Sequence, residues 1–195
     1  MIYIDIQHIG KPNNPDDMGA SKGDDVFDNE AYWTSLYAFH MEMHLRHIGY
    51  SVMRLCDGRY SDRHERVNRY EADYPSSKPS VYLSCHINGG GGSYGAYFYD
   101  HRSSLGPDLA AAIADEVDLP GISAAKTLPA SPGDWTRNAY ATIKDVRRPV
   151  SICLEPFFID NPAHQRYMDV DKIYLVGEAI ANGIHSWYIN QGEQP

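Results

Sequence analysis

The sequence is poor in cysteine and contains no long apolar run. Its three cysteines, Cys56, Cys85 and Cys153, are widely spaced and odd in number. This excludes a disulfide framework, and we interpret them as reduced, buried small residues. No apolar stretch approaches the ~20 residues that a bilayer-spanning helix needs, so we expect no membrane insertion. The N-terminus begins directly with a strand pattern and lacks the basic segment and apolar core of a signal peptide. We therefore expect synthesis in the cytoplasm.

Positive charge is also in short supply. The chain of 195 residues carries 17 Lys and Arg against 26 Asp and Glu, which gives a net charge of −9. Because nucleic-acid backbones are bound by clustered Lys and Arg, this balance argues against a nucleic-acid partner. The length fits one domain and no internal repeat is present. We expect residues 1–195 to form a single domain that acts as a monomer.

What the sequence does contain is an alternation of strand and helix patterns. Asp28 is the expected N-cap of the first helix and Gly49 its terminator, whereas residues 119–149 hold four prolines and are predicted to be irregular, over one rim of a cleft. Strands are predicted at 2–7, 51–55, 80–86, 94–99 and 150–155, and helices at 28–47, 62–74, 105–117 and 171–188. This order predicts an α/β fold, a single-domain three-layer sandwich with a twisted, mostly parallel sheet flanked by helices.

Three of the predicted strands end in side chains that can hold or serve a metal. His8, His86 and Glu155 each follow or close a short run rich in β-branched or aromatic residues. In open α/β sheets, ligands bind beyond the carboxyl ends of the strands. If the three strands are parallel neighbours, these side chains converge there. Two histidines and a carboxylate in one cleft suggest a metal hydrolase.

A catalytic zinc site takes three protein ligands and leaves a fourth position for water, and two histidines with one glutamate are a known set. For the third ligand we favour Glu30, because the loop that leaves the first strand must cross the same end of the sheet before the first helix begins. Glu155 is then a second carboxylate, which does not bind the metal and can move a proton during hydrolysis.

Each of these residues also has a simpler interpretation. His8 and His86 could be strand-end histidines bonded to loop backbone, and Glu30 a first-turn acid favoured by the helix dipole. Glu155 is harder to dismiss, because an acid at the end of so apolar a strand needs a partner or a function. The pair His40 and His44 shares one helix face, but Glu42 lies about 200° around the helix from both, so we interpret that face as solvated.

Motifs in a fixed order add a family resemblance. They are Ile4-Asp5-Ile6-Gln7-His8, Asn29-Glu30, Arg54 with Asp57, Arg63 with Asn68, Ser84-Cys85-His86-Ile87-Asn88, Gly95-Ala96-Tyr97-Phe98-Tyr99 and Leu154-Glu155-Pro156-Phe157-Phe158-Ile159-Asp160-Asn161-Pro162. Over nearly its whole length the chain resembles the zinc-dependent N-acetylmuramoyl-L-alanine amidases of the amidase-3 type. It departs from the usual Asp-Pro-Gly-His-Gly-Gly opening around His8, and it carries Pro156 and Phe157 after Glu155. These departures bear on specificity more than on the zinc site.

The resemblance implies one zinc ion held by His8, Glu30 and His86, with Glu155 as general acid/base. The implied substrate is peptidoglycan, cut at the amide between N-acetylmuramic acid and L-alanine. No wall-binding repeat follows residue 188, so we expect a catalytic domain without a separate wall-binding domain. Since no signal peptide is apparent, we expect a phage lysin that reaches the wall through a separate pore-forming protein, a holin.

Two other functions fit parts of the sequence. A zinc carboxypeptidase or small-molecule amidohydrolase on a similar fold would need an arginine in the cleft to bind a carboxylate. The available residues for that role are Arg54, Arg63, Arg137 and Arg147. A non-catalytic wall-binding module is the second alternative, and the presence of Glu155 counts against it because a binder needs no base.

Overall fold

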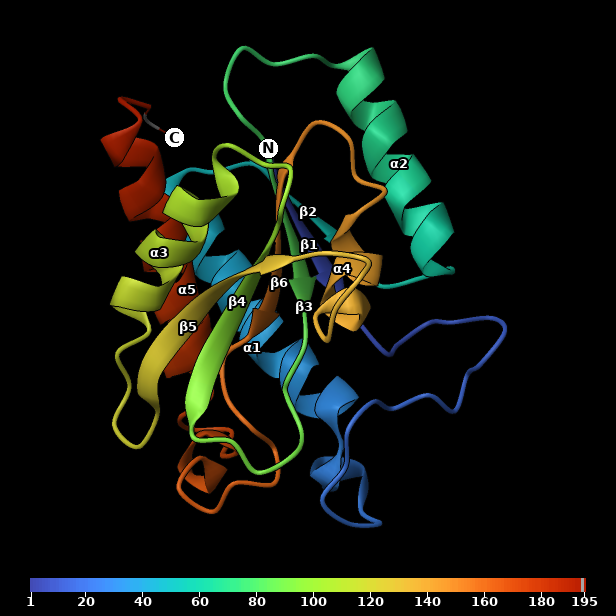
Figure 1. Cartoon of the computed structure of the whole chain (residues 1–195), viewed down its shortest axis with the longest axis vertical. Helices are drawn as coiled ribbons and strands as arrows, with labels where there is room; N and C mark the ends of the chain where they lie inside the picture. Colours follow the sequence, from blue (N-terminus) through green and yellow to red (C-terminus); the bar gives the residue numbers. More distant parts are fainter. Residues whose placement is uncertain (194) are drawn as a thin grey trace.

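Six strands form one mixed sheet with helices on both faces (Figure 1), as the computed structural model describes it for residues 1–193 and 195. The strands are β1 (Ile2–Ile6), β2 (Val52–Leu55), β3 (Val81–Cys85), β4 (Tyr94–Asp100), β5 (Ser123–Ala130) and β6 (Val150–Glu155). The helices are α1 (Glu30–Ile48), α2 (Tyr60–Asp73), α3 (Gly106–Glu116), α4 (Arg137–Ile143) and α5 (Tyr174–Asn190), with short 3-10 turns η1 (Val26–Asp28) and η2 (Gln165–Tyr167).

The sheet has the strand order β2-β1-β3-β6-β4-β5. Its first four strands are parallel, β4 runs antiparallel to β6, and β5 runs parallel to β4. The strands β1, β3 and β6 are therefore parallel neighbours, so their carboxyl ends meet at one edge of the sheet. The predicted α/β sandwich with a mostly parallel sheet is confirmed.

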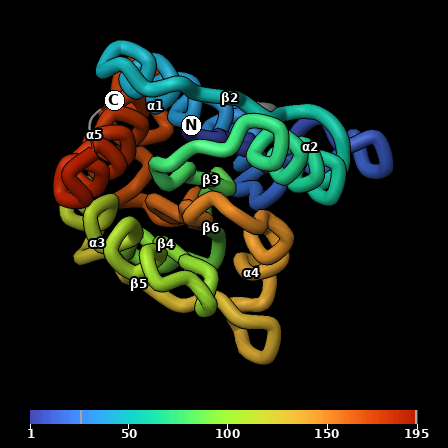
Figure 2. The backbone as a smooth tube through the Cα atoms, turned by 90° about the horizontal axis from the view of Figure 1, so that it is seen from above, coloured from blue at the N-terminus to red at the C-terminus, as the bar shows by residue number. Residues whose placement is uncertain are grey.

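Helices α1, α3 and α5 cover one face of the sheet, and α2 and α4 cover the other (Figure 2). The alternation of side chains along β1 assigns its residues to the two layers. Ile2 and Ile4 pack in the core with α1, α3 and α5, whereas Tyr3 packs against α2 and α4. Central parallel strands are buried on both faces, which explains the apolar runs in the sequence. Among the described residues, no helix is long and apolar enough to cross a bilayer.

The segment 119–149, predicted to be irregular, is the main correction. It contains β5 and the short helix α4. β5 is an edge strand whose residues are mostly exposed and include Pro129. Proline is tolerated at a sheet edge because one side of the strand needs no ladder hydrogen bonds. An exposed edge strand has no buried face, so it shows no apolar alternation in the sequence.

The ends of the helices differ slightly from the prediction. The N-cap of α1 is Asn29 rather than Asp28, and its side chain accepts a hydrogen bond from the Tyr32 N–H (3.0 Å). The terminator Gly49 is confirmed, with φ of 115° in the region that favours glycine. Because α1 starts at Glu30, that carboxylate lies in the first turn, beside the carboxyl ends of the central strands.

Candidate metal centre

Four side chains with metal or proton chemistry occupy the carboxyl end of the sheet. His8 lies just beyond β1, His86 directly follows β3, and Glu155 is the last residue of β6. Glu30 begins α1 and points back toward the same edge, because its carboxylate contacts the His8 and His86 rings. Residues from four separate elements are thus brought together by the parallel order of the sheet.

His8, Glu30 and His86 form a compact set of potential metal ligands. Glu30 Oε1 lies 3.2 Å from His8 Nε2 and 2.8 Å from His86 Nδ1, and the two ring nitrogens are 3.2 Å apart. In a tetrahedral zinc site with bonds of about 2.0–2.1 Å, neighbouring ligand atoms are about 3.3 Å apart. The three atoms therefore fit around such an ion with only a small outward shift, and the donor set leaves a fourth position open.

The Glu30 carboxylate is held in place by backbone donors. It accepts hydrogen bonds from the N–H groups of Ala20 (2.8 Å) and Ile87 (3.1 Å). Gly19 passes close to it, with φ of 75°, and a Cβ there would lie 2.4 Å from Glu30 Oε2, so only glycine fits. Burial by itself would raise the pKa of Glu30, but the two histidines outweigh burial and lower it. Glu30 is therefore ionised, as a metal ligand must be.

His8 is held in an unusual backbone conformation. Among the described residues it is the one non-glycine residue with positive φ, 61°, and such conformations concentrate at functional sites. Its Nδ1 lies 2.9 Å from Asp17 Oδ1, and a carboxylate at Nδ1 leaves Nε2 free to bind a metal. Burial would lower the pKa of His8, but Glu30 and Asp17 raise it overall.

Asp17 was not singled out by sequence reasoning as a partner of His8. Burial by itself would raise its pKa, but hydrogen bonds from Lys11 and His8 lower it to about 2, so Asp17 is ionised. In the sequence Asp17 is one of several acids between His8 and Glu30, and nothing in its spacing indicates that this segment folds back on His8.

Glu155 differs from Glu30 in its surroundings. Its side chain is partly exposed, but Oε2 is buried and has no hydrogen-bond partner among the described residues. Burial, together with the negative charge of Glu30, raises the pKa of Glu155 well above its usual value. Two neighbouring carboxylates with pKa values shifted in opposite directions are typical of a pair with separate roles.

The segments that follow His86 and Glu155 are fastened to each other. Asp160 accepts hydrogen bonds from the N–H groups of Gly90 and Gly91, each at 2.9 Å. Asn88 and Phe158 form a parallel β-bridge. The glycine turn at 89–92 is thus tied to the loop after β6, which restricts the relative movement of the two strand ends.

Arg63 binds the backbone on both sides of His8. Its guanidinium is fully buried and pairs with Asp5 through Nη1 and Oδ1 at 2.6 Å. It also donates to the carbonyl oxygens of Ile6 (2.8 Å) and Ile9. Tyr82 donates its hydroxyl to the second Asp5 oxygen (2.5 Å). A single buried side chain therefore holds the residues that flank His8.

A hollow of about 400 Å³ opens against the histidines. Its lining consists of His8, Tyr60, His86, Asn138, Ala139, Ala141 and Thr142. No arginine lines it, within the part of the chain that the structure describes. Of the candidates for binding a carboxylate, Arg63 is buried against Asp5 and Arg54 pairs with Glu42 (3.4 Å).

The histidines of α1 belong to no group of three potential metal ligands among the described residues. His44 contacts Asn182 (2.8 Å), and Glu42 pairs with Arg46 (3.0 Å) on the same helix. In the described part of the chain, His8, Glu30 and His86 are the one group with three potential ligands in reach of each other. The three cysteines are free, and Cys85 and Cys153 are buried.

Comparisons with known proteins point to one family. Residues 2–186 match the family Amidase_3, N-acetylmuramoyl-L-alanine amidase. No curated protein matches the chain. Cwp6 from Clostridium difficile has a similar structure (TM-score 0.72, 19% identity), with 95% of this chain covered but only 28% of Cwp6.

Two further solved structures are similar along nearly their whole length. The CwlD amidase from Clostridioides difficile, solved in complex with the GerS lipoprotein, gives a TM-score of 0.71 at 16% identity and covers 97% of this chain and 98% of its own. The catalytic domain of the CD27L endolysin targeting Clostridia difficile gives 0.61 at 18% identity and covers 100% and 98%. At these identities the structural likeness supports the fold.

Proposed function

The chain belongs to the N-acetylmuramoyl-L-alanine amidase family, Amidase_3, and from that membership we propose that His8, Glu30 and His86 hold one zinc ion that serves its reaction. As a member of this family the protein is an enzyme, an amidase that acts on peptidoglycan. The observation that carries the zinc proposal is the set of 2.8–3.2 Å spacings among the three ligand atoms. An ion held there supplies Lewis acidity to the scissile carbonyl and to water.

In the proposed mechanism Glu155 moves the protons. It takes a proton from the attacking water and delivers it to the nitrogen of L-alanine as the bond between the lactyl carbonyl carbon and that nitrogen breaks. Its raised pKa suits the second step, because the carboxyl group keeps the proton that it has taken from the water until it donates that proton to the leaving amine. Asp17 and Arg63 act as positioning residues that hold His8 for the metal.

The decisive experiment follows both the metal and the new chain ends. Peptidoglycan digested by the protein should gain amino-terminal alanine, metal analysis should find close to one zinc per chain, and a chelator should stop the reaction until zinc is restored. His86→Ala should lose both zinc and activity, whereas His101→Ala, on the end of β4 away from the centre, should keep them. Full activity in the chelated protein would reject the zinc proposal.

The same digest separates the two alternatives. A zinc carboxypeptidase would release carboxy-terminal residues, and a wall-binding module would pellet with walls and release nothing. The absence of an arginine from the described lining of the hollow at His8 and His86 favours the amidase over the carboxypeptidase. An enzyme that grips a terminal carboxylate needs a fixed cation beside its metal.

We also propose that the protein is a phage lysin, a monomer that reaches the wall through a separate holin. The support is that its substrate class lies outside the cytoplasmic membrane and that the catalytic domain of an endolysin shares its fold. Expression in a growing culture should lyse the cells only when a pore-forming protein is produced with it. Lysis without that partner would contradict this proposal and leave the amidase reaction unaffected.

A further inference from the structure

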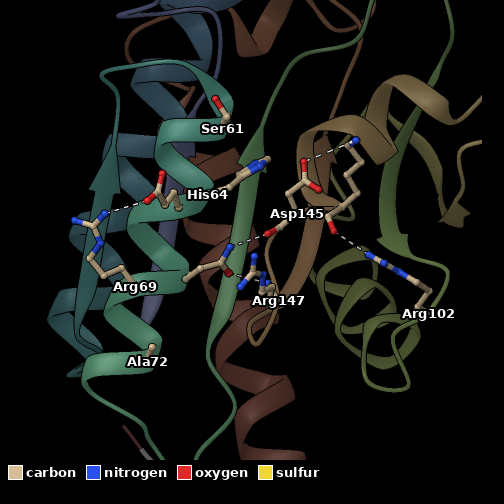
Figure 3. A pocket seen from close by; sticks show the side chains of 10 residues that line it. Ser61, His64, Arg69, Ala72, Arg102, Asp145 and Arg147 are labelled. Atoms are coloured by element: carbon tan, nitrogen blue, oxygen red, sulfur yellow. Dashed lines mark hydrogen bonds and ion pairs between the residues drawn. The ribbon is translucent and has the colours of Figure 1, made fainter.

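A second hollow, which shares no lining residue with the hollow at the histidines, lies between α2 and the loop 144–149 that joins α4 to β6 (Figure 3). It encloses about 750 Å³, more than the hollow at the histidines. Its lining consists of Ser61, His64, Glu65, Asn68, Arg69, Ala72, Arg102, Lys144, Asp145 and Arg147. None of the proposed zinc ligands takes part, and neither does Glu155. We call this hollow the α2 groove.

The α2 groove is cationic although the whole chain carries a net charge of −9. Four basic side chains and two acids line it. An adjoining hollow of about 520 Å³ shares Arg102, Lys144 and Arg147 and adds one more cation, Arg148, and one acid, Asp100. A local surplus of positive charge in a recess on an acidic protein attracts anions and repels cations.

The wall of the groove that carries Lys144 and Arg147 is fixed in position. Asn68 of α2 donates to the Asp145 carbonyl (2.8 Å) and accepts from the Arg147 N–H (2.9 Å). Arg102 donates to the Lys144 carbonyl (2.9 Å). Figure 3 shows these bonds bridging the loop to α2 on one side and to Arg102 on the other. A preformed wall loses little conformational entropy when a ligand binds.

The donors of the groove are unequally engaged. Arg69 pairs with Glu65 (3.0 Å), Arg102 with Asp100 (2.5 Å), and Lys144 more loosely with Asp145 (3.8 Å). The Arg147 guanidinium has no ion pair or hydrogen bond with any described residue. Its planar fork matches the geometry of carboxylate and phosphate oxygens. Arg147 is therefore the main candidate to bind an incoming anion.

His64 adds a hydrogen-bond acceptor to a lining in which the cationic side chains are donors. Its Nε2 lies 2.9 Å from the Thr142 carbonyl, so Nε2 carries the proton and Nδ1 is an acceptor. Nδ1 is buried without a partner among the described residues, and burial lowers the pKa of His64, which keeps the ring neutral. A ligand with hydroxyl or amide groups beside its anionic groups would complement this lining.

The length of the groove indicates a polymer rather than a single ion. From Ser61 to Ala72 its wall follows α2, which rises about 1.5 Å per residue and so extends for about 16 Å. The cations lie along and opposite this wall. An extended chain with repeated anionic groups can contact several of them at once.

We propose that the α2 groove binds an anionic polymer of the cell wall through Lys144, Arg147 and Arg102, separately from the metal centre. The oxyanion chemistry rests on the groove alone, and the choice of a wall polymer rests on the proposed function. Of the wall components with such groups, we favour a phosphodiester polymer, because its charges repeat along one extended chain as the cations do along the groove; the carboxylates of peptide stems are the alternative that the test separates. Binding in the α2 groove would keep this acidic enzyme on the cell wall between successive hydrolysis events.

Binding to purified poly(glycerol phosphate) and to cell walls tests this proposal. The double variant Lys144→Glu/Arg147→Glu should weaken binding at least about tenfold, because each charge-assisted contact is worth about 1.5–3 kcal/mol. The dependence of affinity on salt should fall as well. Wall binding is measured in a Glu155→Gln background so that the wall is not cut, and release of alanine from soluble muropeptides by the otherwise unmodified variant should not change.

A matched control reverses two positive charges at another place on the surface. Arg166→Glu/Lys172→Glu alters two exposed residues outside the α2 groove and should leave binding unchanged. The neutral variant Lys144→Gln/Arg147→Gln should weaken binding in the same direction with less risk to folding. Loss of binding with intact walls but not with walls stripped of phosphate polymers supports the phosphodiester. Loss on both would overturn that assignment in favour of the stem carboxylates.

Three further results would overturn the proposal. They are equal weakening by the groove variant and the control, full binding by both groove variants, and no binding of either probe by the unmodified protein. None of them depends on zinc or on hydrolysis, so failure of the α2 groove and failure of the proposed amidase mechanism are distinguishable.

Discussion

Replacing Glu155 with Gln is expected to lower turnover by about 10²–10⁴-fold, the usual contribution of a general acid/base, while the protein keeps its zinc. Glutamine preserves the shape of the side chain but neither accepts nor donates a proton at the relevant pH. Because the zinc ligands are proposed to be His8, Glu30 and His86, the metal content should not change. The measurements are the rate at which amino-terminal alanine appears from peptidoglycan and the zinc content per chain.

The stability of this variant provides an independent check. Glu155 has a buried oxygen without a partner among the described residues and a raised pKa, so its ionised form is disfavoured in the folded protein. Removing the titratable group should leave the free energy of unfolding unchanged or raise it at high pH. Glu116→Gln, an exposed acid on α3, is the matched control and should change neither rate nor stability. Undiminished hydrolysis, or loss of zinc, in the Glu155 variant would reject its assigned role.

The second large effect is expected at Arg63. Arg63→Met should destabilise the fold by about 3–5 kcal/mol, because it leaves the Asp5 carboxylate buried without its cation. Both residues are fully buried and their contact is 2.6 Å. For a chain of this length, such a loss lowers the unfolding midpoint by on the order of 10 °C. Zinc affinity should fall as well, since Arg63 also holds the Ile6 and Ile9 carbonyls beside His8.

Two comparisons separate this buried pair from ordinary surface charge. Arg66 lies on α2 like Arg63, but its Nη1 forms an exposed ion pair with Asp57 Oδ1 (2.9 Å). Arg66→Met removes this pair, and exposed pairs contribute only about 0–1 kcal/mol to stability. The double variant Arg63→Met/Asp5→Asn should recover part of the lost stability, because no buried charge is left unpaired. Thermal and urea unfolding would measure all three. A loss for Arg63→Met no greater than for Arg66→Met would contradict the interpretation.

Much of the fold was predictable because its signals are local. The strands β1, β3 and β6 are buried on both faces, so each appears in the sequence as a continuous apolar run. Each run is followed or closed by a polar residue, and parallel pairing brings His8, His86 and Glu155 to one edge. Glu30 could be added because a chain that leaves β1 must cross that edge to start α1.

The edge strand β5 and the helix α4 were missed for the opposite reason. β5 has little buried surface and is held in the sheet by pairing with β4, so its residues show no pattern of their own. The short helix α4 buries mainly Thr142 and Ile143. Elements stabilised mainly by neighbours distant in sequence leave a weak local signal.

From the sequence alone came the fold class and the four side chains of the proposed centre, because burial and strand direction act over a few residues at a time. Tertiary contacts were needed to place Asp17 on His8, Arg63 under Asp5, and Lys144 and Arg147 beside α2. These contacts join side chains or backbone up to 79 positions apart. Hydrogen bonds and ion pairs depend on distances of a few ångströms in space, and no spacing along the chain encodes them.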